Sequence, residues 1–195
     1  MLDTKVLLSD QVDAREIALV LRELDRTRGV AGDIVEFGCY VGTTSVFLGT
    51  QREKGKQLFL YDSFEGLPEK GLQDISPVGQ QFVAGELAAT KKQLLSNLKR
   101  AGVHDARVKK AWFSDLTDVD VPESISFAFL DGDYYDSILI PLQLIWERLS
   151  PGAIVIVDDY ANEALPGAAR AVDTWLHRHD ASLHIEHSLA IMRLP

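Results

Sequence analysis

Apolar residues in this chain recur first at helical spacing and then in short continuous runs. Between residues 12 and 27, side chains such as Ile17, Val20 and Leu24 alternate with charged residues, which predicts an amphipathic helix. Later apolar runs, such as residues 125–130, are typical of strands buried on both faces of a sheet. The predicted strands are residues 33–37, 56–61, 106–111, 125–130 and 153–157; the predicted helices between them are residues 43–51, 86–101, 136–149 and 164–177. A polar loop over residues 66–85 and a final hairpin (184–186 with 190–194) complete the pattern.

Strands that alternate with helices predict a doubly wound α/β fold with a mostly parallel sheet and helices on both faces. The pattern divides the chain into an N-terminal helical segment, residues 1–31, and one α/β domain, residues 32–195. In open sheets of this kind, ligands bind at the carboxyl ends of the strands. Candidate functional residues are therefore those that directly follow each predicted strand.

The end of the first predicted strand has a glycine turn. Gly38 and Gly42 allow a tight turn and a close approach of a ligand, and the next helix opens with Thr43. The spacing is G-x-x-x-G, so the dinucleotide fingerprint G-x-G-x-x-G is absent. Asp62 ends the second strand, 20 residues beyond Gly42, where a carboxylate can bind both ribose hydroxyls. Asp62 as the start of a turn is the alternative, but the two motifs together favour nucleoside binding.

Two aspartate clusters follow the fourth and fifth predicted strands. They contain Asp131 and Asp133 in one loop and Asp158 and Asp159 in the other. Carboxylates held about 4 Å apart repel by roughly 1–4 kcal/mol per pair, and a divalent cation removes that cost. Oxygen ligands suit Mg²⁺. No Cys or His lies near these motifs, which argues against a structural zinc site. The alternative is that Asp133 or Asp136 caps the following helix.

Composition excludes several classes of protein. The 195 residues include 29 acidic and 20 basic ones, a net charge of −9, which argues against a nucleic-acid partner. No apolar stretch of about 18 residues predicts a membrane span, no secretory signal is recognised, and the single cysteine, Cys39, cannot form an internal disulfide. We therefore expect a cytoplasmic protein without a membrane partner. Trp112 is either part of an adenine pocket or part of the core.

Several of these motifs together resemble the macrocin O-methyltransferase family. The matching segments are Glu36-Phe-Gly-x-x-x-Gly42, Tyr61-Asp-Ser-Phe-Glu-Gly-Leu-Pro-Glu69, Trp112-Phe-Ser-Asp115, Leu130-Asp-Gly-Asp-Tyr134 and Val155-Ile-Val-Asp-Asp-Tyr160. The resemblance implies a class I methyltransferase (Rossmann-like) fold, with S-adenosylmethionine and Mg²⁺ as cofactors. It also implies methyl transfer to a hydroxyl of a sugar or glycosylated natural product in antibiotic biosynthesis.

The resemblance also implies a role for each motif residue. Those implied at the cofactor are Glu36, Gly38 and Gly42 for its methionine part, Asp62 for the ribose, and Ser63 and Phe64 at the adenine; Thr43, Trp112 and Asp131 are further cofactor candidates. The implied metal ligands are Asp131, Asp158 and Asp159. Asp133 is the implied general base.

Three alternatives stay open on the sequence. A catechol-type O-methyltransferase would also use strand-end aspartates and a metal. A nicotinamide-dependent dehydrogenase shares the fold class, and a non-catalytic cofactor-binding protein would keep the same motifs. For the partners we expect a small-molecule hydroxyl substrate, with a homodimer as one open alternative for the assembly.

Overall fold

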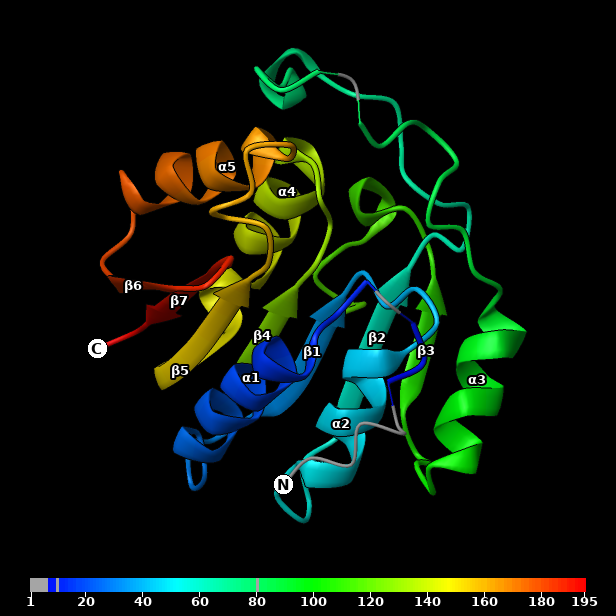
Figure 1. Ribbon diagram of the computed structural model, residues 1–195. Coiled ribbons are helices and arrows are strands. Elements are labelled where there is room, and N and C mark those ends of the chain that lie inside the picture. Colours follow the sequence, from blue (N-terminus) through cyan, green and yellow to red (C-terminus); the bar gives the residue numbers. More distant parts are fainter. Residues whose placement is uncertain (1–6, 10, 80) are drawn as a thin grey trace.

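The computed structural model describes residues 7–9, 11–79 and 81–195 (Figure 1). Of the predicted N-terminal segment 1–31, residues 1–6 and 10 lie outside this described part, and the boundary at residue 31 stays a prediction. The helices are α1 (Ala14–Arg26), α2 (Thr43–Gln51), α3 (Lys91–Arg100), α4 (Tyr135–Ile145) and α5 (Pro166–Leu176). The strands are β1 (Asp33–Phe37), β2 (Leu58–Asp62), β3 (Arg107–Lys110), β4 (Ile125–Leu130), β5 (Leu149–Val157), β6 (Ser182–Glu186) and β7 (Leu189–Arg193). Short 3-10 turns are η2 (Leu72–Asp74), η3 (Phe113–Asp115) and η4 (Trp146–Arg148).

The strands form one seven-stranded sheet in the order β3-β2-β1-β4-β5-β7-β6. Strands β1 to β5 pair in parallel, while β7 pairs antiparallel with both β5 and β6. The predicted doubly wound sheet and its terminal hairpin are therefore confirmed. Strand order reverses between β1 and β4, which is the point where ligands bind in such sheets.

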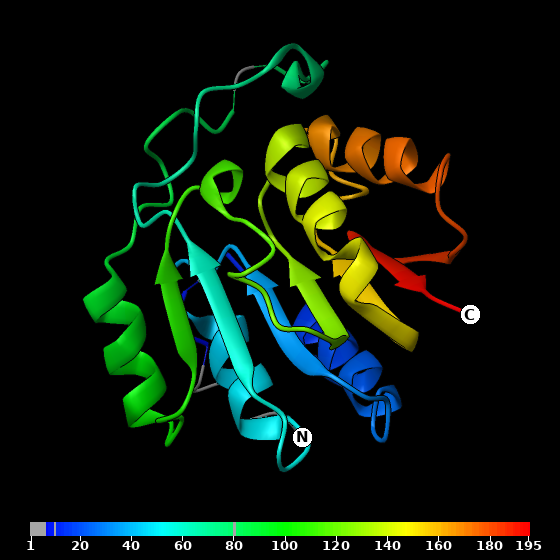
Figure 2. The ribbon, with the colours of Figure 1, turned by 180° about the vertical axis from the view of Figure 1, so that it is seen from behind.

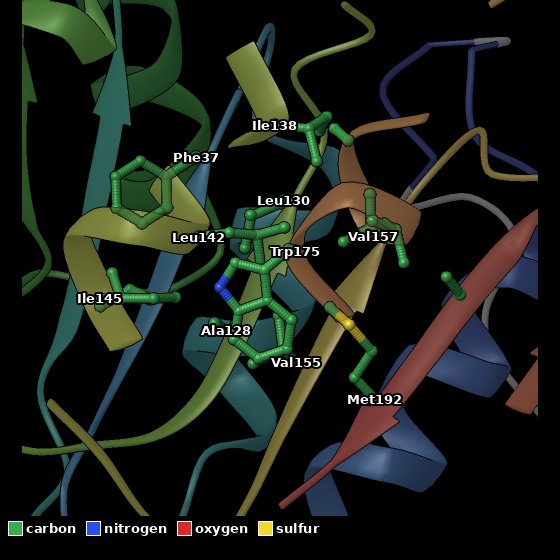
Figure 3. Close-up of a cluster of buried hydrophobic side chains, with 14 of the residues drawn as sticks. Phe37, Ala128, Leu130, Ile138, Leu142, Ile145, Val155, Val157, Trp175 and Met192 are labelled. Carbon is green, nitrogen blue, oxygen red and sulfur yellow. The ribbon is translucent and has the colours of Figure 1, made fainter. Parts of the chain in front are cut away.

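Helices cover both faces of the sheet because strand side chains alternate between the faces (Figures 1 and 2). On β4, Phe127 and Phe129 pack with α1, α2 and α3, whereas Ala128 and Leu130 pack with α4 and α5. Figure 3 shows the layer on the α4 and α5 side of the sheet, in which Trp175 of α5 lies among residues of β4, β5 and α4. Burial on both faces accounts for the continuous apolar runs in the sequence.

Helix α3 differs from its prediction. It begins at Lys91 rather than at residue 86, and the Thr90 hydroxyl accepts a hydrogen bond from Gln93 N at 3.1 Å as its N-terminal cap. The preceding residues belong to the long loop because Glu86 O accepts a hydrogen bond from Leu67 N, and Leu87 has a φ of 56°. We call residues 66–79 and 81–90 the docking loop. It rises over the carboxyl ends of the strands, and its turn η2 contacts α5 (Figure 1).

Within the described residues, no helix combines the length and the apolar character that a membrane span requires.

Candidate active site

A cavity of about 480 Å³ opens at the carboxyl ends of the parallel strands. Residues that follow β1, β2, β4 and β5 line it, together with the first turn of α1 and parts of the docking loop. This volume is within the range typical of small-molecule and cofactor sites. The cavity therefore occupies the position that the strand pattern predicts.

The glycine turn after β1 brings two strand ends together. Gly38 has a φ of 87°, and a Cβ atom built there would lie 1.9 Å from the carbonyl oxygen of Asp131. Gly42 has a φ of 92° and precedes Thr43, the first residue of α2. The turn thus requires glycine at position 38 both for its backbone conformation and for the close contact with Asp131, the residue that follows β4.

Asp62 holds this turn from the neighbouring strand. Its Oδ2 accepts hydrogen bonds from Cys39 N at 2.8 Å and Tyr40 N at 3.1 Å, and its Oδ1 accepts one from Phe64 N at 2.6 Å. A carboxylate has about four acceptor positions, so one remains for a ligand hydroxyl. Asp62 therefore starts a turn, which was the alternative, and also lines the cavity where a ribose is expected.

The other predicted adenine-side residues separate into two groups. Ser63 and Trp112 line the cavity, whereas Phe64 is not among the lining residues and packs against the core on the α1 to α3 side of the sheet. Phe64 has a φ of 55°, a conformation that turns the chain immediately after Asp62. The contribution of Phe64 in this structure is to the turn and the core.

Glu36 is a buried carboxyl at the cavity wall. It is 1% exposed, and its Oε2 has no hydrogen-bond partner within the described part of the chain. Burial raises the pKa of Glu36 to about 8, and the negative charge of Asp62 contributes to the rise. A buried carboxylate oxygen without a partner is costly, so this position fits a ligand that supplies a cationic donor such as an ammonium group.

The two aspartate clusters meet at the cavity. Asp131, Asp133 and Asp159 each offer a carboxylate oxygen, and these oxygens all lie within 4.8 Å of one another. Asp133 and Asp159 have positive φ values of 62° and 58°, so their backbone is held in a conformation that is unfavourable for a non-glycine residue. The donor set is all oxygen and suits a hard divalent cation.

Asp158 lies beside this group but is bound differently. Its Oδ1 accepts hydrogen bonds from Asp159 N at 2.7 Å and from Ser188 Oγ at 3.0 Å. Burial is the largest cause of the raised pKa in Asp131, Asp133, Asp158 and Asp159, and neighbouring carboxylates raise it further. For Asp158 the pKa rises to about 7. Of the three predicted metal ligands, the donor group thus contains Asp131 and Asp159 but not Asp158. Its third member is Asp133, the predicted general base.

Neither Asp133 nor Asp136 caps α4. The N-terminal cap of α4 is Tyr134, whose side chain makes no capping bond. Instead Asp74 of the docking loop accepts a hydrogen bond from Tyr135 N at 2.7 Å, while its second oxygen accepts one from Gly71 N at 2.9 Å. The capping alternative for the two aspartates is therefore wrong, and the capping carboxylate comes from 61 residues earlier in the chain.

The described residues that line the cavity carry charge of a single sign. Among the described residues that line it there is no Lys, Arg or His, and the acidic ones are Glu16, Glu36, Asp62, Asp131, Asp133, Asp136, Asp158 and Asp159. Such a lining favours cationic ligands and repels phosphate groups. It therefore suits a sulfonium cofactor and a metal ion better than a dinucleotide.

The docking loop supplies an apolar wall. Leu67, Phe82 and Leu87 of the loop line the cavity together with Leu165, and they pack around Tyr134. The Tyr134 hydroxyl donates a hydrogen bond to Phe82 O at 3.0 Å. This wall and the aspartates bound the same cavity, so a ligand here meets both carboxylates and apolar side chains.

Sequence reasoning missed Glu16, Asp74, Phe82 and Asn162. Asn162 donates to Asp159 Oδ1 at 2.8 Å, and its position shortly after the Asp158–Asp159 pair was the one available signal. Glu16 lies three residues after Asp13 in a capping box, a pattern that marks a helix start and gives no indication of a cavity. No local signal marks the contact of Asp74 with Tyr135 or that of Phe82 with Tyr134, because these partners lie far along the chain.

Comparisons with known proteins agree with this geometry. The family described as "Macrocin-O-methyltransferase (TylF)" matches residues 17–189. A protein of Streptomyces olivaceus named 8-demethyl-8-(2,3-dimethoxy-alpha-L-rhamnosyl)-tetracenomycin-C 4'-O-methyltransferase is 36% identical over 146 residues, which cover 70% of this chain and 56% of the relative. Mycinamicin III 3''-O-methyltransferase of Micromonospora griseorubida is 29% identical over 166 residues, with 79% and 64% covered. The chain thus spans less than two thirds of the length of these relatives.

Solved structures show the same fold. The O-methyltransferase NovP aligns with a TM-score of 0.77 at 21% identity, covering 92% of this chain and 79% of that one. CalS11, a calicheamicin methyltransferase, aligns with a TM-score of 0.74 at 20% identity, covering 93% and 80%. These similarities confirm the predicted class I methyltransferase fold.

Proposed function

The chain belongs to the macrocin O-methyltransferase family, and from this membership we propose that it transfers a methyl group from S-adenosylmethionine to a hydroxyl of a sugar or glycosylated natural product. One observation carries the proposal: among the described residues that line the cavity at the strand ends, the charged ones are all carboxylates. A sulfonium, an ammonium and a divalent cation each match that lining.

Two groups of cavity residues have distinct roles in this proposal. Glu36 would hold the ammonium of the cofactor's methionine part beside Gly38 and Gly42, and Asp62 would accept a ribose hydroxyl. Asp131, Asp158 and Asp159 would hold Mg²⁺. When bound, S-adenosylmethionine would supply the methyl group and Mg²⁺ would lower the pKa of the acceptor hydroxyl.

Asp133 is the proposed general base. It lies within the same 4.8 Å donor group as Asp131 and Asp159. Burial raises its pKa, and the negative charges of Asp159 and Asp158 raise it further. A carboxylate with a raised pKa is a stronger proton acceptor, so Asp133 Oδ would take the hydroxyl proton as the methyl group is transferred. The fixed positions of the aspartates and the loop wall would orient the acceptor toward the cofactor.

The acceptor class is the finer part of the proposal. The curated relatives named above are methyltransferases of glycosylated natural products, and their names favour a sugar hydroxyl. The apolar wall of Leu67, Phe82 and Leu87 would contact the non-sugar part of such a molecule. A cytoplasmic location and a homodimer stay predictions of the sequence.

Methyl transfer to two panels of acceptors tests the function. The protein is incubated with S-adenosylmethionine, Mg²⁺ and either glycosides or catechols, and S-adenosylhomocysteine is measured by mass spectrometry. We expect methylated glycosides, loss of turnover with EDTA and recovery when Mg²⁺ is restored.

Other outcomes would contradict the proposal in distinguishable ways. Turnover of catechols alone supports the catechol-type alternative. Tight NADH binding without S-adenosylmethionine binding supports a dehydrogenase, although the carboxylate lining disfavours its phosphates. Cofactor binding without turnover of either panel supports a non-catalytic protein.

A further inference from the structure

The turn between β6 and β7 contacts the metal-side aspartates from outside the cavity. Ser188 Oγ lies 3.0 Å from Asp158 Oδ1 and 3.0 Å from Glu16 Oε1. The carbonyl oxygen of Ser188 also accepts a hydrogen bond from Ala161 N at 3.2 Å. The hairpin turn therefore holds the Asp158–Asp159 loop through both a side chain and the backbone.

Glu16 is itself held in place at the start of α1. Its Oε2 accepts a hydrogen bond from Asp13 N at 3.0 Å, which leaves Oε1 for Ser188. A serine hydroxyl has one proton, so two carboxylates at equal distance compete for it or share it. Without the Ser188 hydroxyl, the carboxylates of Glu16 and Asp158 would lose the donor between them and would repel each other.

From these contacts we propose that Ser188 is a positioning residue for the metal-binding carboxylate of Asp158. Its hydroxyl and the Asp159 amide occupy Oδ1, so Oδ2 is the oxygen that Asp158 offers to a divalent cation. The inference rests on the proposed function, because it presumes that the aspartates bind a metal. Outer partners that orient metal ligands typically change metal affinity by 10- to 100-fold when removed.

Metal titration of the cofactor-free protein tests the proposal. Binding of Mg²⁺ is measured by calorimetry and binding of Mn²⁺ by electron paramagnetic resonance, in the wild type and in Ser188→Ala. We expect metal affinity to fall at least tenfold in Ser188→Ala, and Ser188→Thr to restore it because the hydroxyl is kept. Affinity for S-adenosylmethionine without metal should stay within twofold, because Ser188 does not line the cavity.

Ser182→Ala is the matched control. Ser182 lies on the same hairpin and is exposed, and among the described residues its hydroxyl bonds Arg193 O alone, at 3.4 Å. Its metal affinity should equal that of the wild type, and thermal unfolding shows that each variant is folded. If Ser188→Ala fails to fold, Ser188→Cys, with its weaker donor, should give a partial loss of affinity.

Two results would overturn the inference. Equal metal affinity in Ser188→Ala and Ser182→Ala removes the positioning role and leaves the proposed function intact. Absence of saturable metal binding in the wild type removes both the inference and the metal part of the proposed function. Methyl transfer that persists in EDTA would then identify a metal-independent enzyme.

Discussion

The two halves of the cavity are constructed in different ways. The half at β1 and β2 is fixed by the backbone: the Asp62 carboxylate accepts three main-chain N–H groups, and Gly38 packs against a main-chain carbonyl. The half toward α4 and α5 is closed by the docking loop, which is held largely by side chains such as Asp74. The first half is therefore part of the sheet, whereas the second can change its lining while the sheet stays intact.

The largest effect is expected at Asp133, which lines the cavity. Asp133→Asn keeps the size of the side chain but removes the proton acceptor, so kcat should fall by about 10²- to 10⁴-fold. Affinity for S-adenosylmethionine should stay within a few-fold. Steady-state kinetics and calorimetry measure the two quantities. Asp136→Asn, another cavity-lining aspartate, is the control, and an equal loss of kcat there would contradict the special role of Asp133.

The backbone-built half should be the less tolerant of added atoms. In Gly38→Ala the new Cβ would meet Asp131 O at 1.9 Å at a positive φ, so we expect a loss of about 3–5 kcal/mol in the free energy of unfolding. Gly55→Ala also has a positive φ but nothing within 4 Å, and should lose about 1–2 kcal/mol. Urea denaturation compares the two variants. Equal losses would show that the contact with Asp131 is unimportant.

Glu36 provides a pH test of the same half. The folded protein holds the Glu36 proton more tightly than the unfolded chain, since the pKa is raised from 4.5 to about 8. Wild-type stability should therefore fall as pH rises through this window, by up to about 1.4 kcal/mol per pH unit, whereas Glu36→Gln should lack this contribution. Denaturation curves recorded from about pH 5 to about pH 8.5 cover most of the range between the two pKa values. They measure how the free energy of unfolding differs between the wild type and the variant.

Cofactor binding adds a second readout for Glu36. A bound ammonium favours the ionised carboxylate, so binding at pH 7 should release protons, measurable by calorimetry in buffers of different ionisation enthalpy. Glu36→Gln should abolish this release and weaken S-adenosylmethionine binding by about tenfold or more. Proton release that is unchanged in the variant would assign the protons to another group.

The smallest effect is expected at the anchor of the docking loop. Asp74→Ala removes the cap of α4 and should cost about 1 kcal/mol of stability. The KM for the acceptor should rise a few-fold while cofactor affinity is unchanged, and hydrogen exchange should increase in the loop. Asp115→Ala, at an exposed position, is the control. A parallel loss of cofactor affinity in Asp74→Ala would mean that the two halves are coupled.

The same contrast explains how much the sequence could predict. Strand ends carry their chemistry in adjacent residues, so Gly38, Asp62 and the aspartate pairs could be placed at one edge of the sheet from the apolar runs alone. The half of the cavity toward α4 and α5 could not be predicted in this way. Asp74 acts on α4 from 61 residues away, and Phe82 reaches Tyr134 across a loop with no periodic pattern.

Helix boundaries could likewise be predicted where adjacent residues determine them and not where distant contacts do. Helix α1 falls within its predicted range because its apolar positions and caps are local. The predicted start of α3 is wrong. The hydrogen bond from Leu67 N to Glu86 O keeps this segment in the loop, although its composition is typical of a helix. Tertiary contacts override local propensity at such positions.

The one-signed lining of the cavity also bears on the end of the catalytic cycle. Methyl transfer would convert a cationic sulfonium into a neutral thioether, so the spent cofactor would lose its attraction to the surrounding carboxylates. The substrate form is thus favoured over the product form by charge alone. This asymmetry would limit product inhibition and assist turnover, without any movement of the protein.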